Sequence, residues 1–170
     1  MDLKAHIRHV PDFPKPGIQF DDIPTLLRQA DGFRATVDAL AAPYANRGIE
    51  VVVGIESRGF ILGAAVAERL GAGFVPIRKP GKLPAGAIRE AYALEYGTDA
   101  LEIHLDAIGK GQRTLLVDDV LATGGTAAAA AKLVGDLGAE LVGLVFLIEL
   151  GFLSGRAKLT GHSVQSVLQY

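Results

Sequence analysis

The segment 115–126, LLVDDVLATGGT, constrains the fold of this chain most strongly. It begins as an apolar run, continues into two adjacent carboxylates, Asp118 and Asp119, and ends in a glycine pair between two threonines. An Ala-rich stretch with helical character follows over about residues 125–137. A continuous apolar strand that leads into a helix is typical of a parallel sheet buried on both faces. The segment therefore predicts one strand–helix unit of an α/β fold.

The rest of the chain repeats this alternation of strands and helices. Short apolar strands are predicted over residues 50–55, 74–77, 114–117 and 141–148, and helices over 59–70 and from Asp31 to about 47. Strand–helix–strand units joined by right-handed crossovers build an α/β fold. The chain has 170 residues and shows neither an internal repeat nor a linker. We therefore expect residues 1–170 to form a single domain, with a mostly parallel twisted sheet flanked by helices.

Two segments depart from this alternation. Residues 9–22, HVPDFPKPGIQFDD, contain three prolines and a glycine, which predicts an ordered loop. Residues 78–87, RKPGKLPAGA, are basic and rich in glycine and proline. The alternating stretches 91–96 and 101–105 come next, and they predict a β-hairpin that turns at Gly97, Thr98 and Asp99.

The composition of the chain excludes several classes of binding partner. The formal net charge is −2, so the whole surface exerts no general attraction on nucleic acid or on an acidic membrane, and any anion site must be local. The chain has no cysteine, which excludes disulfides and thiolate metal sites. The first residues, MDLK, contain no apolar signal segment, and the apolar run 141–148 is too short to span a bilayer. We expect a cytoplasmic protein with neither nucleic acid nor membrane as a partner.

The glycine-rich turn after Asp119 has the features of a phosphate site. A helix N-terminus presents unpaired N–H groups and a partial positive charge, and glycines let the backbone approach a ligand closely. The turn lacks the lysine of a GxxxxGK[ST] loop, and no GxGxxG follows a strand, so the common nucleotide loops are not matched. Two carboxylates beside a phosphate cradle suit a sugar phosphate, because carboxylates accept hydrogen bonds from ribose hydroxyls. The alternative is an ordinary strand-to-helix turn with an aspartate as the helix cap.

The sequence VDDVLATGGT resembles the motif with which type I phosphoribosyltransferases bind phosphoribosyl pyrophosphate (PRPP). The resemblance implies the type I phosphoribosyltransferase fold for this chain. It also implies that Asp118 and Asp119 contact the ribose hydroxyls. The loop that follows is expected to bind the 5′-phosphate through Ala122, Thr123, Gly124, Gly125 and Thr126.

Pyrophosphate, the leaving group of such an enzyme, requires local cations. Arg58 follows the first predicted strand, and three further cations follow the second. A solvated basic loop is the alternative interpretation of the latter. GIESRGF and RKPGKLP, however, resemble the adenine branch of the family, in which the first forms a pyrophosphate-binding turn, often with a cis peptide, and the second opens the catalytic loop. The resemblance implies that pyrophosphate is bound by Glu56, Ser57, Arg58, Arg78, Lys79 and Lys82.

Two more segments resemble the adenine branch. ALEYGTDALEIHLDAI resembles part of its mobile loop, which implies a flexible hairpin lid over about residues 79–105. PDFPKPGIQFDDI resembles its hood over the base, here about residues 9–23. The resemblance implies catalytic roles for Glu95, Tyr96 and Arg58, and adenine contacts at Gln19, Phe20 and Asp21. The alternatives are a surface strand position for Glu95 and a core position for Phe13 or Phe20.

These resemblances predict an enzyme that joins adenine to PRPP and releases AMP and pyrophosphate. They also imply a homodimer. Mg²⁺ is expected to arrive on PRPP, because it prefers phosphate and water oxygens. No protein-ligated metal is expected, since His6 and His9 lack a third ligand nearby. Two alternatives stay open: a regulator that senses PRPP on the same fold without catalysis, and a phosphoribosyltransferase for another purine.

Overall fold

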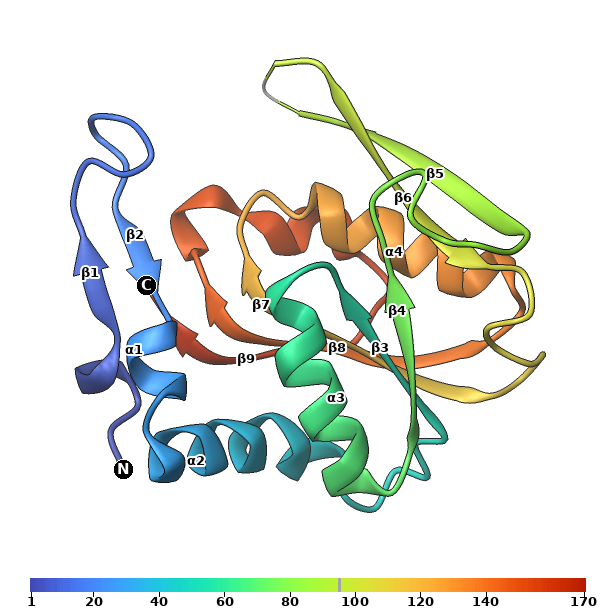
Figure 1. Cartoon of the computed structure of the whole chain (residues 1–170), viewed down its shortest axis with the longest axis horizontal. Helices are drawn as coiled ribbons and strands as arrows, with labels where there is room; N and C mark the ends of the chain where they lie inside the picture. Colours follow the sequence, from blue (N-terminus) through green and yellow to red (C-terminus); the bar gives the residue numbers. More distant parts are fainter. Residues whose placement is uncertain (95) are drawn as a thin grey trace. The chain divides into compact units, whose positions relative to one another are not determined.

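The computed structural model of the chain describes residues 1–94 and 96–170. The chain divides into two compact units, Met1–Ala39 and Leu40–Tyr170. The larger unit contains a five-stranded sheet with all neighbouring strands parallel, in the order β4-β3-β7-β8-β9 (Figure 1). Its strands are β3 (Val51–Ile55), β4 (Gly73–Ile77), β7 (Arg113–Leu121), β8 (Glu140–Glu149) and β9 (Val164–Gln169). The predicted α/β class is confirmed.

The two long helices of this unit cover opposite faces of the sheet. Helix α3 (Arg58–Leu70) connects β3 to β4, and helix α4 (Gly125–Asp136) connects β7 to β8. These crossovers run in opposite directions along the sheet, so right-handed connections place α3 on one face and α4 on the other (Figure 1). The strand order reverses between β3 and β7. A crevice forms at such a reversal, outside the carboxyl ends of the strands, and ligands bind there in open α/β sheets.

The core follows from the apolar runs that predict the strands. Every residue of β3 is buried, and so are residues 114–117 of β7 and 142–149 of β8. On α4, the small side chains of Ala127, Ala129 and Ala130 are buried along with Leu133 and Val134. Alanines let this helix lie close to the sheet. The strands are therefore covered on both faces, as their unbroken apolar character predicts.

A second, antiparallel pair of strands follows β4. Strands β5 (Ala87–Ala93) and β6 (Thr98–His104) form a hairpin in which Tyr92 lies opposite Asp99. The prediction of a turn at 97–99 was wrong, because the Leu94 N–H donates to the Gly97 carbonyl at 2.9 Å and the two strands are thus already joined ahead of Thr98. Gly97 takes the positive φ of +88° that closes the turn, so Thr98 and Asp99 belong to β6.

The smaller unit contains a 3₁₀ turn, η1 (Lys4–His6), two short strands, β1 (Arg8–Val10) and β2 (Phe20–Asp22), the short helix α1 (Pro24–Leu27) and most of α2 (Ala30–Ala41). The prediction of a loop over 9–22 was wrong at both ends, because β1 and β2 pair antiparallel. The three prolines lie in the connection between these strands, where no ladder N–H is needed. Phe13 in this connection packs edge-on against Phe20, with ring centroids 5.2 Å apart.

Two boundaries also differ from the predictions, and one strand was not predicted. Helix α2 ends at Ala41 and is followed by a 3₁₀ turn, η2 (Ala42–Tyr44), because Pro43 lacks the N–H that would continue the helix. Strand β7 extends to Leu121, so Asp118 and Asp119 are strand residues. Strand β9 was not predicted, since VQSVLQ has no continuous apolar run. Two further 3₁₀ turns, η3 (Gly151–Leu153) and η4 (Gly155–Leu159), precede it.

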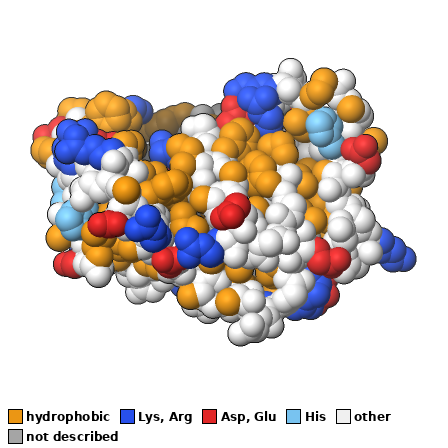
Figure 2. Space-filling model, turned by 60° about the horizontal axis from the view of Figure 1, so that its bottom comes forward, with side chains coloured by type: hydrophobic (Ala, Val, Ile, Leu, Met, Phe, Trp, Pro, Cys, Tyr) orange, Lys and Arg blue, Asp and Glu red, His pale blue; other side chains and the backbone are white. Residues whose placement is uncertain are grey.

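One face of the molecule carries charges of both signs (Figure 2). On the face in Figure 2, lysine and arginine side chains are interspersed with acidic and apolar ones. Within residues 1–94 and 96–170, none of the helices combines the length and the apolar character needed to cross a membrane.

Candidate active site

A cavity of about 470 Å³ opens at the carboxyl ends of β3, β4 and β7, at the reversal of strand order. Most of its wall comes from the segments that follow β3 and β7, and Lys79 follows β4. The residues that line it are Glu56, Ser57, Arg58, Lys79, Asp118, Asp119, Val120, Leu121, Ala122, Thr123, Gly124, Thr126 and Ala127. The sequence thus predicted ten of these residues, and it missed Val120, Leu121 and Ala127, which have no polar side chain to mark them.

The glycine-rich turn forms the start of α4 as predicted. Gly124 precedes the helix with a φ of +88°, a conformation that suits glycine. A Cβ atom on Gly124 would also overlap the carbonyl group of Gly155, because η4 lies directly behind the turn. The first hydrogen bond of the helix joins the Ala128 N–H to the Gly124 carbonyl at 2.9 Å. The N–H groups before it are therefore available to an anion.

The acidic pair lies at the edge of this cavity. Asp119 is buried and its carboxylate is ion-paired with the Arg58 guanidinium, which comes from the start of α3. Asp118 accepts a hydrogen bond from the Asp119 N–H at 2.9 Å. A Cβ atom on Gly59 would lie only 2.7 Å from Asp118 Oδ1, so glycine at this position lets α3 approach β7.

Burial raises the pKa of Asp118, and the negative charge of Asp119 raises it further, against the opposing effect of Arg58. One member of the pair is thus neutralised by a guanidinium and the other binds a proton more readily than a free aspartate. The two side chains together repel an anionic ligand less than two exposed carboxylates do.

Glu56 organises the basic segment that follows β4. Its carboxylate accepts a hydrogen bond from the Lys79 N–H at 2.9 Å, forms an ion pair with Lys82, and lies 3.5 Å from Arg78 Nε. Burial alone raises the pKa of Glu56, but the hydrogen bonds and charges of these partners outweigh it and lower the pKa overall. The peptide between Glu56 and Ser57 is cis, in agreement with the resemblance of this turn.

Lys79 lines the cavity and also contacts the hairpin of β5 and β6. Its ammonium group is ion-paired with Asp99 and lies 3.2 Å from the Tyr92 hydroxyl. Burial lowers the pKa of Lys79, but these hydrogen bonds more than compensate and the pKa is raised. The Lys79 hydrogen bond lowers the pKa of Asp99. Sequence reasoning missed Tyr92 and Asp99 as site residues. A turn placed at 94–97 would have shown that they face each other across the hairpin.

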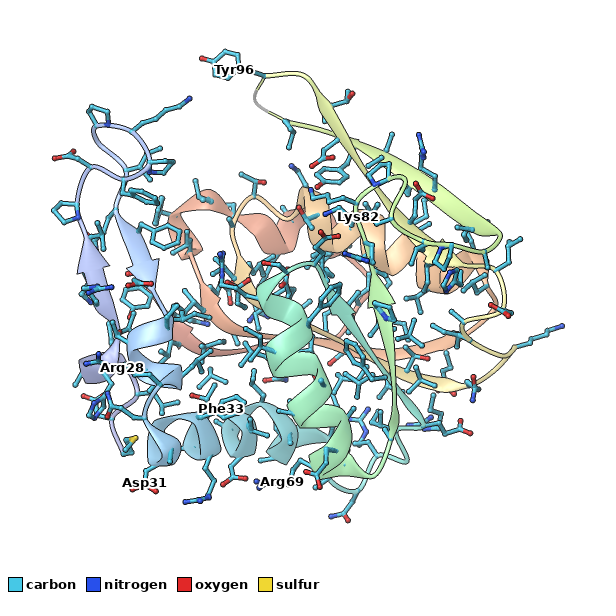
Figure 3. The ribbon with its side chains drawn as sticks, viewed as in Figure 1. Arg28, Asp31, Phe33, Arg69, Lys82 and Tyr96 are labelled. Carbon is cyan, nitrogen blue, oxygen red and sulfur yellow. The ribbon has the colours of Figure 1, made fainter. Side chains whose placement is uncertain are left out.

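Some predicted site residues lie away from the cavity wall. Arg78 and Lys82 contact Glu56 instead, and Gly125 faces the ring of Tyr92. Tyr96 is 81% exposed at the free end of the hairpin, at a distance from Lys82 in Figure 3. Glu95 lies outside the described residues.

The three predicted adenine contacts belong to the smaller unit. Gln19 is exposed, Phe20 is half-buried against Phe13, and the carboxylate of Asp21 lies 2.6 Å from His9 Nδ1. Phe20 and Asp21 are residues of β2. Their backbone is therefore held in place by pairing with β1. The prediction of a loop did not include this pairing.

Comparison with known proteins identifies the family. Residues 19–163 match the model of the phosphoribosyl transferase domain. An adenine phosphoribosyltransferase of Solibacter usitatus is 60% identical and aligns over 99% of this chain and 98% of its own length. The crystal structure of adenine phosphoribosyltransferase from Thermoanaerobacter pseudethanolicus is similar with a TM-score of 0.96 and 50% identity, over 99% of this chain and 98% of that one.

A more distant relative was solved with ligands. Adenine phosphoribosyltransferase from Saccharomyces cerevisiae, in complex with an imino-altritol bisphosphate and adenine, has a TM-score of 0.93 and 42% identity, over 98% of this chain and 97% of that one. The chain therefore belongs to the phosphoribosyltransferase family and, within it, to the adenine phosphoribosyltransferases.

Proposed function

We propose that this chain transfers the 5-phosphoribosyl group from PRPP to adenine and releases AMP and pyrophosphate. One observation carries the proposal: a single cavity brings together an acidic pair, a glycine-rich helix N-terminus and the cations Arg58 and Lys79. These features match the three parts of PRPP, which are a ribose with two hydroxyls, a 5′-phosphate and a pyrophosphate. The family to which the chain belongs supports the same substrate.

The proposed orientation of PRPP follows from the positions of these groups. The 5′-phosphate binds in the turn 122–126, at the N-terminus of α4, which no side chain caps. The ribose hydroxyls donate to Asp118 and Asp119. The pyrophosphate then extends toward Arg58, the backbone of the turn at Glu56–Ser57, and Lys79, with Arg78 and Lys82 kept near that end by Glu56.

The protein's contribution to the reaction is mainly electrostatic and positional. Displacement of pyrophosphate by adenine N9 inverts ribose C1 and develops oxocarbenium character at that carbon. The negative charge that grows on the leaving pyrophosphate is stabilised by fixed cations, which need no reorganisation during the step. Water must be excluded because it would hydrolyse PRPP. We propose that the lid, residues 79–105, closes over the cavity for this purpose.

Adenine is proposed to bind under the hood, residues 9–23. Gln19 and Asp21 offer backbone donors and acceptors, and Phe20 offers an apolar ring for the purine. Glu95, with Tyr96 beside it on the lid, is proposed to take part in moving the proton of the purine imidazole ring. The preference for adenine is supported by the relatives, since the Saccharomyces cerevisiae enzyme was crystallised with adenine.

Mg²⁺ is proposed to enter with PRPP. Among residues 1–94 and 96–170, no group of three or more His, Asp or Glu side chains is arranged to hold a metal ion. The cavity carboxylates of Asp119 and Glu56 already hold Arg58 and Lys82. Oxygen atoms of PRPP and water suit this ion. Mg²⁺ bound in this way would further neutralise the negative charge of the pyrophosphate.

The test compares three bases. The protein is incubated with PRPP and labelled adenine, guanine or hypoxanthine in parallel, and the nucleotide products are separated. We expect AMP from adenine and little product from the other two. Product from hypoxanthine or guanine at the rate seen with adenine would support a transferase for another purine. PRPP binding without any nucleotide would support a regulator that senses PRPP.

We also propose that the chain acts as a homodimer, on the strength of its resemblance to the adenine branch. Light scattering at the protein concentrations used in the assay measures the molar mass directly. Two copies of the 17.8 kDa chain are expected. The mass of one copy would contradict the proposal.

A further inference from the structure

The hairpin offers Lys79 a preformed pair of acceptors. Tyr92 and Asp99 are opposite each other in the register of β5 and β6, and the Tyr92 hydroxyl lies 3.3 Å from Asp99 Oδ2. The other carboxylate oxygen, Oδ1, accepts a hydrogen bond from the Ala100 N–H at 2.8 Å. The orientation of the Asp99 carboxylate is therefore set by β6 itself, independently of Lys79.

The contacts within residues 1–94 and 96–170 account for two of the three N–H donors of the Lys79 ammonium. An ammonium group has three N–H donors. One faces Asp99 and one faces the Tyr92 hydroxyl, 3.2 Å away. Because Lys79 forms part of the cavity wall, the third donor is the one available on that side.

Asp99 also keeps Lys79 away from competing carboxylates. Glu56, Asp118 and Asp119 line the same cavity as Lys79, and a flexible lysine with no other partner would be attracted to them. An ammonium held by the ribose-binding carboxylates would occupy the place of the substrate. Asp99 lies on the hairpin, outside the residues that line this cavity, and draws the ammonium to that side.

We propose that Asp99 and Tyr92 are positioning residues that hold the Lys79 ammonium at the hairpin side of the cavity, where its third N–H binds the pyrophosphate group of the substrate. This inference rests on the proposed function. It assigns strands β5 and β6 of the lid a part in binding the leaving group, because Lys79, which contacts the pyrophosphate, is held by Tyr92 and Asp99 on these strands. It also separates two ligands: AMP has no pyrophosphate and depends on the turn 122–126 instead.

The experiment measures the affinities of magnesium pyrophosphate and of AMP by calorimetry on the full chain. Asp99→Ala is expected to weaken pyrophosphate binding about tenfold, as for loss of a hydrogen bond between charged groups, and to leave AMP affinity within about twofold. Asp99→Asn keeps an acceptor without the charge, so a smaller loss is expected. Glu90→Ala is the matched control, since it removes a hairpin carboxylate whose partner, Lys132 at 3.2 Å, lies outside the cavity. It should alter neither affinity.

A double-mutant cycle separates positioning from general damage to the hairpin. In a Lys79→Ala background, Asp99→Ala should cause no further loss of pyrophosphate affinity. The same loss in that background would overturn the proposal, as would unchanged pyrophosphate binding in Asp99→Ala or an equal weakening of AMP. A wild-type protein that does not bind pyrophosphate would overturn it as well. If the wild type binds pyrophosphate yet forms no AMP, the proposed transferase activity fails instead.

Discussion

Replacing Gly155 with alanine tests whether η4 shapes the phosphate-binding turn. A Cβ at this position would lie within 3.0 Å of the Ala122 carbonyl oxygen, 3.1 Å from Leu121 Cδ1 and 3.2 Å from the Gly124 N. Two of these three atoms belong to backbone, which yields less easily than the end of a side chain. Overpacking of this kind costs about 1–3 kcal/mol of unfolding free energy. Because the turn 122–124 is what must move, we expect part of the cost to appear as weaker binding of the 5′-phosphate.

The assay pairs denaturant unfolding with calorimetric titration of AMP. Gly155→Ala should lower the free energy of unfolding by about 1–3 kcal/mol and weaken AMP binding by about three- to tenfold, which corresponds to part of that cost. Gly135→Ala serves as the control, because a Cβ there meets nothing within 4 Å. It should raise the unfolding free energy by about 0.4–1 kcal/mol and leave AMP binding alone. Unchanged AMP affinity in Gly155→Ala would refute the conclusion that η4 supports the turn.

Three further predictions concern carboxylates. Asp118→Asn combined with Asp119→Asn should weaken PRPP binding while circular dichroism stays unchanged, and equal PRPP affinity in calorimetry would remove the ribose assignment. Glu95→Gln should lower kcat by about 10²–10⁴-fold if this residue moves the purine proton. A single-turnover rate within about twofold of the wild type would exclude that role. The carboxylate of Glu149 accepts hydrogen bonds from Arg156, and these lower the pKa of Glu149 from its ordinary value of 4.5. The ionised Glu149 therefore contributes its full stabilisation of the folded state above pH 4.5, and this contribution is lost as the pH falls through the lowered pKa. Acid unfolding of Glu149→Gln should accordingly show a weaker dependence on pH over that range, and an identical pH profile would contradict it.

The parts of the fold that could be predicted are those where one residue type dominates a segment. Unbroken apolar runs such as 51–55 predict buried strands because only a strand covered on both faces needs them. The phosphate turn could be predicted because its backbone conformation requires glycine at 124. The short strand β2 was missed, since the prolines that suggest a loop lie just before it in the chain.

The sequence could predict which residues belong to the site but not the contacts between them. Lys79 and Glu56 line the cavity, as expected of residues at strand ends, and Lys82 reaches it only through its ion pair with Glu56. The pairing between them could not be derived from sequence, because it depends on distances between segments that are far apart in the chain. Asp99 is the clearest case: an error of a few residues in the turn placed it outside any strand and hid its contact with Lys79.

Phosphorus NMR of a reaction mixture tests the proposed transfer most directly. The protein is mixed with PRPP, Mg²⁺ and adenine, and the signals of PRPP, AMP and pyrophosphate are followed together. We predict that PRPP disappears only when adenine is present and that AMP and pyrophosphate appear in equal amounts. Persistence of PRPP in the presence of adenine, with the protein folded and PRPP bound, would contradict the transferase function.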